Sequence, residues 1–176
     1  SMGLLHLLVI RATRPKVHIL VIDPRVDRCA LARELGADVT SEPGPSAFNM
    51  AMEMTNGFGV DAVFDTVGGG KVLDAGIALS RKGGTIVLFA HAPDNEQTSL
   101  NLNSVFKHEK RIVGSYSGSL TEQSTIFDLM ISKSIDPTLL VSHTMPLDDF
   151  ASAYKLAREG KALKILFTPS RAAIKL

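Results

Sequence analysis

The chain has 176 residues, enough for one domain with a sizeable core or for one domain and part of another. Hydrophobic residues make up 45% of it and charged residues 21%, which is ordinary for a globular protein. The net charge of +1 gives no electrostatic reason to expect nucleic acid or an acidic membrane as a partner. The longest apolar run, residues 4–10, is far shorter than a membrane span. The single cysteine, Cys29, excludes an internal disulfide and favours a reducing, cytoplasmic location.

Strand-like and helix-like segments alternate along the first two thirds of the chain. The run VHILVI over residues 17–22 predicts a buried strand that ends at Asp23. Residues 26–35 have helical apolar spacing and are followed by Gly36, where a helix stop belongs. Continuous apolar strands separated by helices indicate a parallel sheet covered on both faces, which is a three-layer α/β fold. By the same criteria we predict strands over residues 38–40, 60–65, 85–90 and 111–116, and helices over residues 45–55 and 71–79.

The pattern changes near Gly118, after a polar loop over residues 93–98 and the strand over residues 111–116. From there we expect elements outside the first sheet, and residues 170–176 have the character of a loose tail. The predicted elements are a helix over residues 119–133, a short strand over 139–142, a helix over 147–158 and a final strand over 164–167.

An acidic residue closes the first predicted strand. In a doubly wound nucleotide-binding sheet, a carboxylate at the position of Asp23 accepts hydrogen bonds from the adenosine ribose hydroxyls. It also repels a ribose 2′-phosphate, so it favours NAD over NADP. The alternative is an ordinary turn, because Asp-Pro is a good turn starter. Arg25 and Arg28 follow directly, and we interpret Arg28 as covering the adenine side of the site, with a solvated role as the alternative.

A glycine at the start of the chain has the right spacing to belong to the same site. The stretch Ser1-Met2-Gly3 precedes an apolar helix and looks like the end of a G-x-G-x-x-G motif whose first two glycines are absent. Gly3 lies twenty residues before Asp23. This is the spacing expected when the last glycine of the motif lets helix and strand pack closely.

An ordered set of motifs resembles the zinc-dependent medium-chain dehydrogenases, which include alcohol, sorbitol and threonine dehydrogenases. The resemblance covers residues 1–169, and the set is specific although each piece alone is weak. The motifs are DPRVDRCALARELGAD (23–38), GVDAVFDTVG (59–68), KGGTIVLFA (82–90), IVGSYS (112–117), MPLDDFASAY (145–154) and GKALKILFTP (160–169).

The resemblance implies a coenzyme-binding role for particular residues. Gly3 would be the last glycine of the phosphate loop, Asp23 would bind the ribose, and Lys164 would reach the pyrophosphate. Core packing is the alternative role for Val67 and Phe89, and a solvated strand position is the alternative for Lys164. The remaining implied contacts are Thr66 and Val67 beside the adenosine half, Phe89 and Ala90 near the nicotinamide through their backbone, and Ser115, Tyr116 and Ser117 on the carboxamide through their main chain. Ala90 departs from the family's usual glycine.

The resemblance also implies a domain organisation. Residues 1–118 would form an incomplete Rossmann-type NAD-binding domain with strand order 3-2-1-4-5-6, N-terminally truncated so that its first, central strand is missing. Residues 119–169 would pack on an absent catalytic domain, and residues 170–176 would be a tail. Apolar side chains such as Ile126, Leu129, Leu156 and Phe167 should then be exposed.

The parent enzyme implied by the resemblance oxidises a secondary alcohol or polyol to a ketone with NAD, while zinc polarises the substrate oxygen. The zinc ligands would lie in the absent N-terminal domain. None of the five histidines of this chain has ligand spacing with a cysteine or a carboxylate cluster. We therefore expect this chain alone to be inactive, to bind NAD poorly and to be poorly stable. The parent would act on a small molecule and form a homo-oligomer through the strand at residues 111–116.

Two other classes of function stay open at this stage. One is a stand-alone nucleotide-binding module without catalysis. The other is a different Rossmann-type enzyme, such as a methyltransferase, which also places an acidic residue on a ribose. The pattern after Gly114 disfavours the methyltransferase. Separate titrations with NAD and S-adenosylmethionine would discriminate between the alternatives.

Overall fold

Parallel strands form the body of the protein, whose computed structural model describes residues 1–169. Strands β1 (Leu20–Ile22) and β2 (Val39–Ser41) pair with each other. Strands β3 (Val60–Asp65), β4 (Ser80–Leu88) and β5 (Arg111–Gly114) form a second sheet in that order. All of these pairings are parallel, which confirms the sheet type predicted from the apolar runs.

Helices connect the strands and pack against them. Helix α4 packs against β3 and β4, whereas α2 packs against β1 and β2 and α3 against β2. Helix α5 follows the polar loop and was not expected, because its five residues are too few to show a helical period. The bounds are α1 (Met2–Thr13), α2 (Val26–Glu34), α3 (Pro45–Met54), α4 (Gly70–Leu79) and α5 (Leu102–Phe106).

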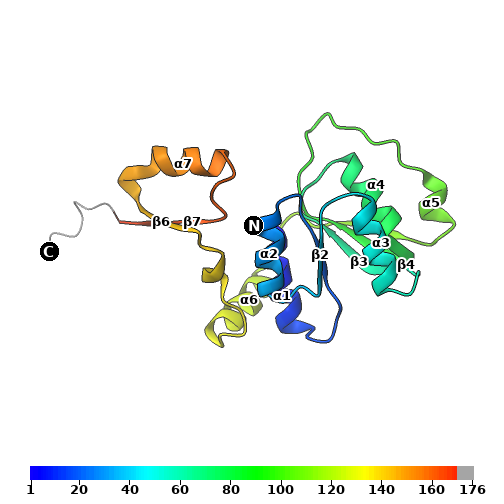
Figure 1. Cartoon of the computed structure of the whole chain (residues 1–176), viewed down its shortest axis with the longest axis horizontal. Coiled ribbons are helices and arrows are strands. Elements are labelled where there is room, and N and C mark those ends of the chain that lie inside the picture. The colour runs from blue at the N-terminus through cyan, green and yellow to red at the C-terminus, as the bar shows by residue number, and fades with distance from the viewer. Residues whose placement is uncertain (170–176) are drawn as a thin grey trace.

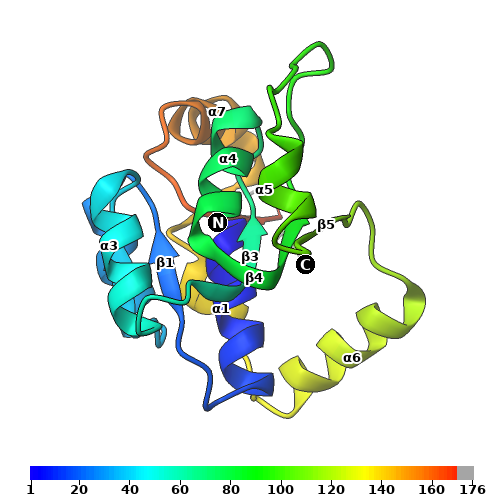
Figure 2. The same ribbon diagram turned by 90° about the vertical axis from the view of Figure 1, so that its right-hand side faces the viewer.

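The two sheets share no strand within the described residues. The expected order places one further strand between β1 and β3, and residues 1–169 do not supply it. Helix α1 contacts both sheets instead and lies between them in Figure 2. Val21 of β1 packs against the core cluster that contains Leu4 and Leu7 of the helix, while the His6 ring lies 5.7 Å from the ring of Phe64 in β3. The helix therefore holds the two halves of the interrupted sheet together.

The main hydrophobic core packs between α1, α2 and the C-terminal segment. Its buried members are Leu4, Leu7, Ala32, Ala37 and Leu140. Leu7 and Leu140 are almost completely buried. Burial of a leucine side chain contributes about 1.5–3 kcal/mol, so these contacts are a substantial part of what holds the C-terminal segment to the body.

The C-terminal segment forms a small sheet of its own. Strands β6 (His143–Pro146) and β7 (Ile165–Thr168) pair in parallel and are connected by the 3₁₀ turn η2 (Leu147–Asp149) and helix α7 (Phe150–Arg158). In Figure 1 this unit, in orange and red, projects away from the sheets of the body. Helix α6 (Leu120–Ile131) precedes it and has no buried residue.

Several predicted strands differ from the observed ones. Strand β4 begins at Ser80 rather than at residue 85 and ends at Leu88, and β5 ends at Gly114 rather than at residue 116. Residues 137–140 form a 3₁₀ helix, η1 (Pro137–Leu140), where a strand over residues 139–142 was expected. Pro137 favours a helical first position, and Asp136 accepts a hydrogen bond from the Thr138 N–H at 2.9 Å, so the chain turns there. At the other end of the chain, Val17 belongs to a turn rather than to β1, because its N–H donates to the carbonyl of Arg14.

Apolar side chains are exposed over the C-terminal third. Ile126, Leu129, Leu156 and Phe167, which were expected to be exposed, are each half-buried. Neighbours of these residues are more exposed, namely Leu120, Phe127, Ile131, Phe150 and Tyr154. The proposed packing of this segment on a catalytic domain stays a prediction. The predicted tail, residues 170–176, lies outside the described residues. No helix within residues 1–169 is long and apolar enough to cross a membrane.

Candidate functional site

The carboxyl ends of β3, β4 and β5 lie side by side. Asp65 pairs with Leu88, and Leu88 pairs with Gly114, so the last residues of the three strands are in register. The residues that follow them, Thr66, Phe89 and Ser115, therefore meet at one edge of the sheet. This is the edge where open parallel sheets bind ligands.

Backbone hydrogen bonds fix this edge. The N–H groups of Phe89 and Ala90 both donate to the carbonyl of Asp65, at 2.9 and 3.1 Å. The N–H of Ser115 donates to the carbonyl of Leu88 at 2.9 Å. The main chain at the predicted nicotinamide positions is thus held by the sheet itself.

A buried carboxylate that was not assigned a role shapes the turn after β3. One oxygen of Asp65 accepts from the N–H groups of Val67 and Gly68, at 2.9 and 2.8 Å. A Cβ on Gly68 would overlap the carbonyl oxygen of His91, so this turn lies directly against the chain after β4. An aspartate followed by a glycine three residues later is a turn signal that sequence reasoning could have used.

Asp23 directly follows β1 and accepts a hydrogen bond within the turn into α2. Its N–H donates to the carbonyl of Ser41, and its Oδ1 accepts from the Arg25 N–H at 2.9 Å. Its Oδ2 lies 4.0 Å from a guanidinium nitrogen of Arg28, and both side chains are about a quarter exposed. The carboxylate and Arg28 are thus neighbours at the strand end.

The first turn of α1 lies between the two groups of strand ends. A Cβ on Gly3 would lie 3.2 Å from Thr66 Oγ1, so the helix packs closely on the turn after β3. No side chain caps this helix N-terminus. Burial lowers the pKa of the Ser1 ammonium group, and the nearby positive charge of Arg28 lowers it further. Lys164 directly precedes β7 and is exposed, and its carbonyl accepts a hydrogen bond from the Ser142 N–H at 2.9 Å.

His6 is a further residue at this edge that sequence reasoning did not place there. Its ring packs edge-on against the Phe89 ring, with centroids 4.7 Å apart. Its Nδ1 is 2.9 Å from the Met2 carbonyl oxygen. The position was hidden because the helical period of α1 alone does not reveal which strand ends the helix faces.

Some predicted residues do not point into a common space. The side chain of Val67 is 71% exposed, which excludes plain core packing among the described residues. Tyr116 is 84% exposed, and its ring contacts that of His91 edge-on at 5.4 Å. Ser117 is exposed, and its hydroxyl lies 3.4 Å from the Gly118 carbonyl.

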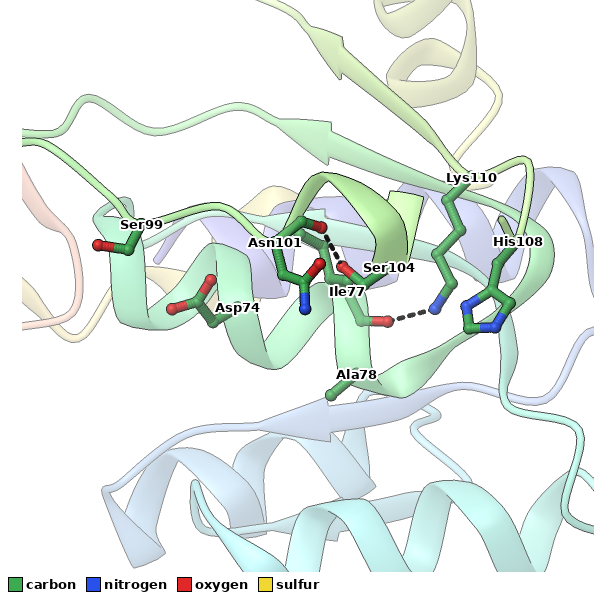
Figure 3. Close-up of a pocket in the computed structure, with 8 residues that line it drawn as sticks. All are labelled: Asp74, Ile77, Ala78, Ser99, Asn101, Ser104, His108 and Lys110. Carbon is green, nitrogen blue, oxygen red and sulfur yellow. Dashed lines mark hydrogen bonds between the residues drawn. The ribbon is translucent and has the colours of Figure 1, made fainter. Parts of the chain in front are cut away.

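A cavity of about 470 Å³ lies elsewhere, between α4 and the segment that leads into β5 (Figure 3). It lies beside the C-terminal half of α4 and the beginning of β5, away from the carboxyl ends of the strands. Lys110 donates from Nζ to the carbonyls of Ile77 and Ser80, at 2.5 and 2.7 Å, and desolvation lowers its pKa. This lysine satisfies the carbonyls at the end of α4, so we assign it a structural role.

No group of three or more histidine, cysteine, aspartate or glutamate side chains that could hold a metal ion occurs within residues 1–169. Cys29 is buried, and its thiol donates to the carbonyl of Asp23. It therefore belongs to the support of the β1 end rather than to a metal site.

Comparison with known protein families agrees with this arrangement. Residues 3–132 match the family described as zinc-binding dehydrogenase. The chain belongs to this family. The match includes α1, both sheets of the body and the turn residues at all four strand ends discussed above.

Individual relatives support the polyol and alcohol branch. The chain is 29% identical over 143 residues to D-arabitol-phosphate dehydrogenase of Enterococcus avium, covering 79% of this chain and 40% of that protein. It is 28% identical over 167 residues to sorbitol dehydrogenase of Pongo abelii, covering 93% of this chain and 46% of that protein. The chain thus spans less than half the length of these relatives. The predicted resemblance to the C-terminal part of medium-chain alcohol and polyol dehydrogenases is confirmed.

Solved structures confirm the fold. A structure described as a short chain alcohol dehydrogenase from E. coli CFT073, complexed with NADH, superimposes with a TM-score of 0.84. The sequence identity is 20%, and the match covers 94% of this chain and 49% of that chain. The Rossmann-type α/β fold predicted from the sequence is therefore correct.

Proposed function

We propose that this chain is the NAD-binding part of a zinc-dependent dehydrogenase that oxidises a secondary alcohol or polyol to a ketone. The observation that carries the proposal is the convergence of Asp23, the first turn of α1 and the ends of β3 and β4 at one edge of the fold. Family membership and the polyol dehydrogenase relatives support it. Bound NAD would supply the hydride acceptor for the oxidation.

The residues at this edge fit an adenine dinucleotide. Asp23 presents a partly exposed carboxylate for the ribose hydroxyls, and the uncapped N-terminus of α1 offers its free N–H groups to a phosphate. Gly3 allows close packing on Thr66 at that helix end. We assign Lys164 a supporting charge for the pyrophosphate, as the resemblance to the zinc-dependent dehydrogenases implies. The main chain after β4 and β5, at Phe89, Ala90 and residues 115–117, would face the nicotinamide half.

The described residues offer no zinc-ligand group, so we assign no catalytic step to this chain. In the proposed enzyme, zinc and the substrate would be held by residues outside it. We therefore propose that the chain alone is inactive. The substrate class, a small alcohol or polyol, is proposed from the relatives.

The proposal is tested by titrating the ¹⁵N-labelled chain with NAD and, separately, with S-adenosylmethionine while backbone amide shifts are recorded. We expect weak binding of NAD, on the order of millimolar, with shifts at the end of β1 and the start of α1. Asp23→Ala should weaken NAD binding about tenfold, because a charged hydrogen bond to the ribose is lost. Asp128→Ala, on the distant helix α6, is the matched control. Shifts at these positions with S-adenosylmethionine but not with NAD would overturn the proposal.

We also propose that two copies of the chain associate through β5. This strand lies at the edge of the three-stranded sheet and pairs only with β4 among the described residues. Its Val113 side chain is 46% exposed. An apolar strand edge of this kind favours pairing with a second copy, and sedimentation velocity measures the resulting state.

A further inference from the structure

Two opposite charges follow β1 in the turn that would meet the adenosine ribose. Asp23 is the carboxylate expected in an NAD site, whereas an arginine close behind such a strand is the residue that accommodates the 2′-phosphate of NADP. Arg25 lies two residues after Asp23 and donates its backbone N–H to the Asp23 carboxylate at 2.9 Å. The turn therefore carries a residue that favours NAD and a residue that could favour NADP. The coenzyme preference then depends on whether the arginine is available to bind a 2′-phosphate.

The guanidinium of Arg25 is already engaged. Its Nε donates to Asp27 Oδ1 at 3.0 Å, and its second terminal nitrogen donates to Asp27 Oδ2 at 2.7 Å. The remaining terminal nitrogen donates to the carbonyl of Gly160 in the C-terminal segment. The two guanidinium nitrogens that bind the Asp27 carboxylate are the donors that would otherwise form a bidentate interaction with a phosphate.

We propose that Asp27 is a specificity-determining residue that preserves the preference for a coenzyme without a 2′-phosphate by occupying Arg25. The inference rests on the proposed NAD-binding function and adds to it the reason why this arginine does not reverse the preference. Asp27 acts through Arg25, because its carboxylate holds the guanidinium in a fork of two hydrogen bonds.

The Arg25–Asp27 pair is exposed, so we expect it to affect the coenzyme preference more than the stability of the fold. The side chains of Arg25 and Asp27 are 39% and 66% exposed, and an ion pair exposed to this extent contributes little to the free energy of unfolding. Replacement of Asp27 should therefore leave the fold intact. Arg28 differs, because it lies beside Asp23 at 4.0 Å and is not held in a fork.

The test uses two small probes that differ only in the phosphate at issue, 5′-AMP and adenosine 2′,5′-bisphosphate. Both are titrated into the ¹⁵N-labelled chain, and dissociation constants are taken from amide shifts at the β1–α2 turn. This method measures weak binding. The variants are Asp27→Asn, the double variant Arg25→Gln with Asp27→Asn, and Glu34→Gln as a control that removes one negative charge from the other end of α2.

We expect the unaltered chain and Glu34→Gln to prefer 5′-AMP. Asp27→Asn should bind the 2′,5′-bisphosphate about fivefold more tightly and leave 5′-AMP binding unchanged, and the double variant should lose this gain. An unchanged ratio in Asp27→Asn would overturn the inference, and so would a gain that persists without Arg25. If the unaltered chain bound neither probe, the proposed function would fail, and this inference with it.

Discussion

A single glycine before β3 shows how strongly one residue can constrain the body. Gly59 has φ of +87°, and a Cβ there would lie 2.7 Å from the Leu79 carbonyl oxygen and 2.9 Å from the Arg81 nitrogen. Gly57 has a similar φ of +83°, but a Cβ there would meet nothing within 4 Å. An alanine at Gly57 would therefore introduce backbone strain alone, whereas an alanine at Gly59 would introduce the same strain together with steric overlap.

We expect Gly59→Ala to lower the free energy of unfolding by about 3 kcal/mol or more, because strain and overlap with fixed backbone add. Gly57→Ala should cost only about 1 kcal/mol, the cost of the left-handed conformation. Urea unfolding of both variants followed by circular dichroism measures the difference. Equal losses in the two variants would show that the contact between Gly59 and the start of β4 is not rigid.

The same residues mark the limit of sequence reasoning at this scale. Asp23 was identified because its role depends on the strand directly before it. The turn role of Asp65 also depends on neighbours in sequence, but the close approach at Gly59 depends on β4, which enters the sheet twenty residues later. Local patterns predict local roles, and contacts between distant segments need the structure.

At the scale of elements, one arginine fastens the end of α1 to its surroundings. Arg11 donates to the carbonyl of Gly36 and to Asp38 Oδ2, the latter at 2.7 Å. The same Asp38 oxygen accepts from the Ile19 N–H at 2.7 Å. This network joins α1, the approach to β1 and the loop before β2. It also explains why β1 begins later than predicted, since Arg11 holds the carbonyl of Val17 in the preceding turn.

The hydrogen bond from Ile19, followed by that from Arg11, lowers the pKa of Asp38 below its usual value of 3.8. A carboxyl group whose pKa is lower in the folded state stabilises the fold above its unfolded pKa, and that contribution is lost as pH falls through the folded value. We expect Asp38→Asn to cost about 1 kcal/mol at pH 7 and progressively less below about pH 4. Urea titrations at pH 7 and pH 3 provide the comparison. A cost that does not depend on pH would mean that the charge of Asp38 has no part in it.

At the scale of the whole molecule, two features matter for association with other chains: the division of the strands into two sheets and the unpaired edge of β5. The elements of both sheets could be predicted because each strand is a continuous apolar run. The separation of the strands into two sheets is not visible in any single apolar run of the sequence. It was expected only from the strand order that the family resemblance implies. At the candidate site, the positions at the strand ends can be predicted from the runs that precede them, whereas the contacts of His6 with Phe89 and of Arg25 with Gly160 depend on packing between distant segments.

If copies pair through β5, a charge at the centre of that edge should prevent it. We expect the unaltered chain to sediment as a dimer and Val113→Lys to sediment as a monomer, because a lysine on an edge strand opposes pairing. Phe58→Lys, which alters an exposed apolar residue in a turn, is the matched control and should remain dimeric. A monomeric unaltered chain at micromolar concentration would contradict the proposed association.

The parallel pairing of the strands has a consequence for how fast the chain can fold. Leu20 pairs with Val39, Thr85 with Arg111, and His143 with Ile165, so each pairing closes a loop of about twenty residues or more. No strand pair among the described residues is a hairpin that could form early and locally. Every sheet contact must wait for a helical crossover to be brought into place, and such non-local contacts slow folding. We therefore expect refolding in which helical signal appears before any strand amide is protected from hydrogen exchange.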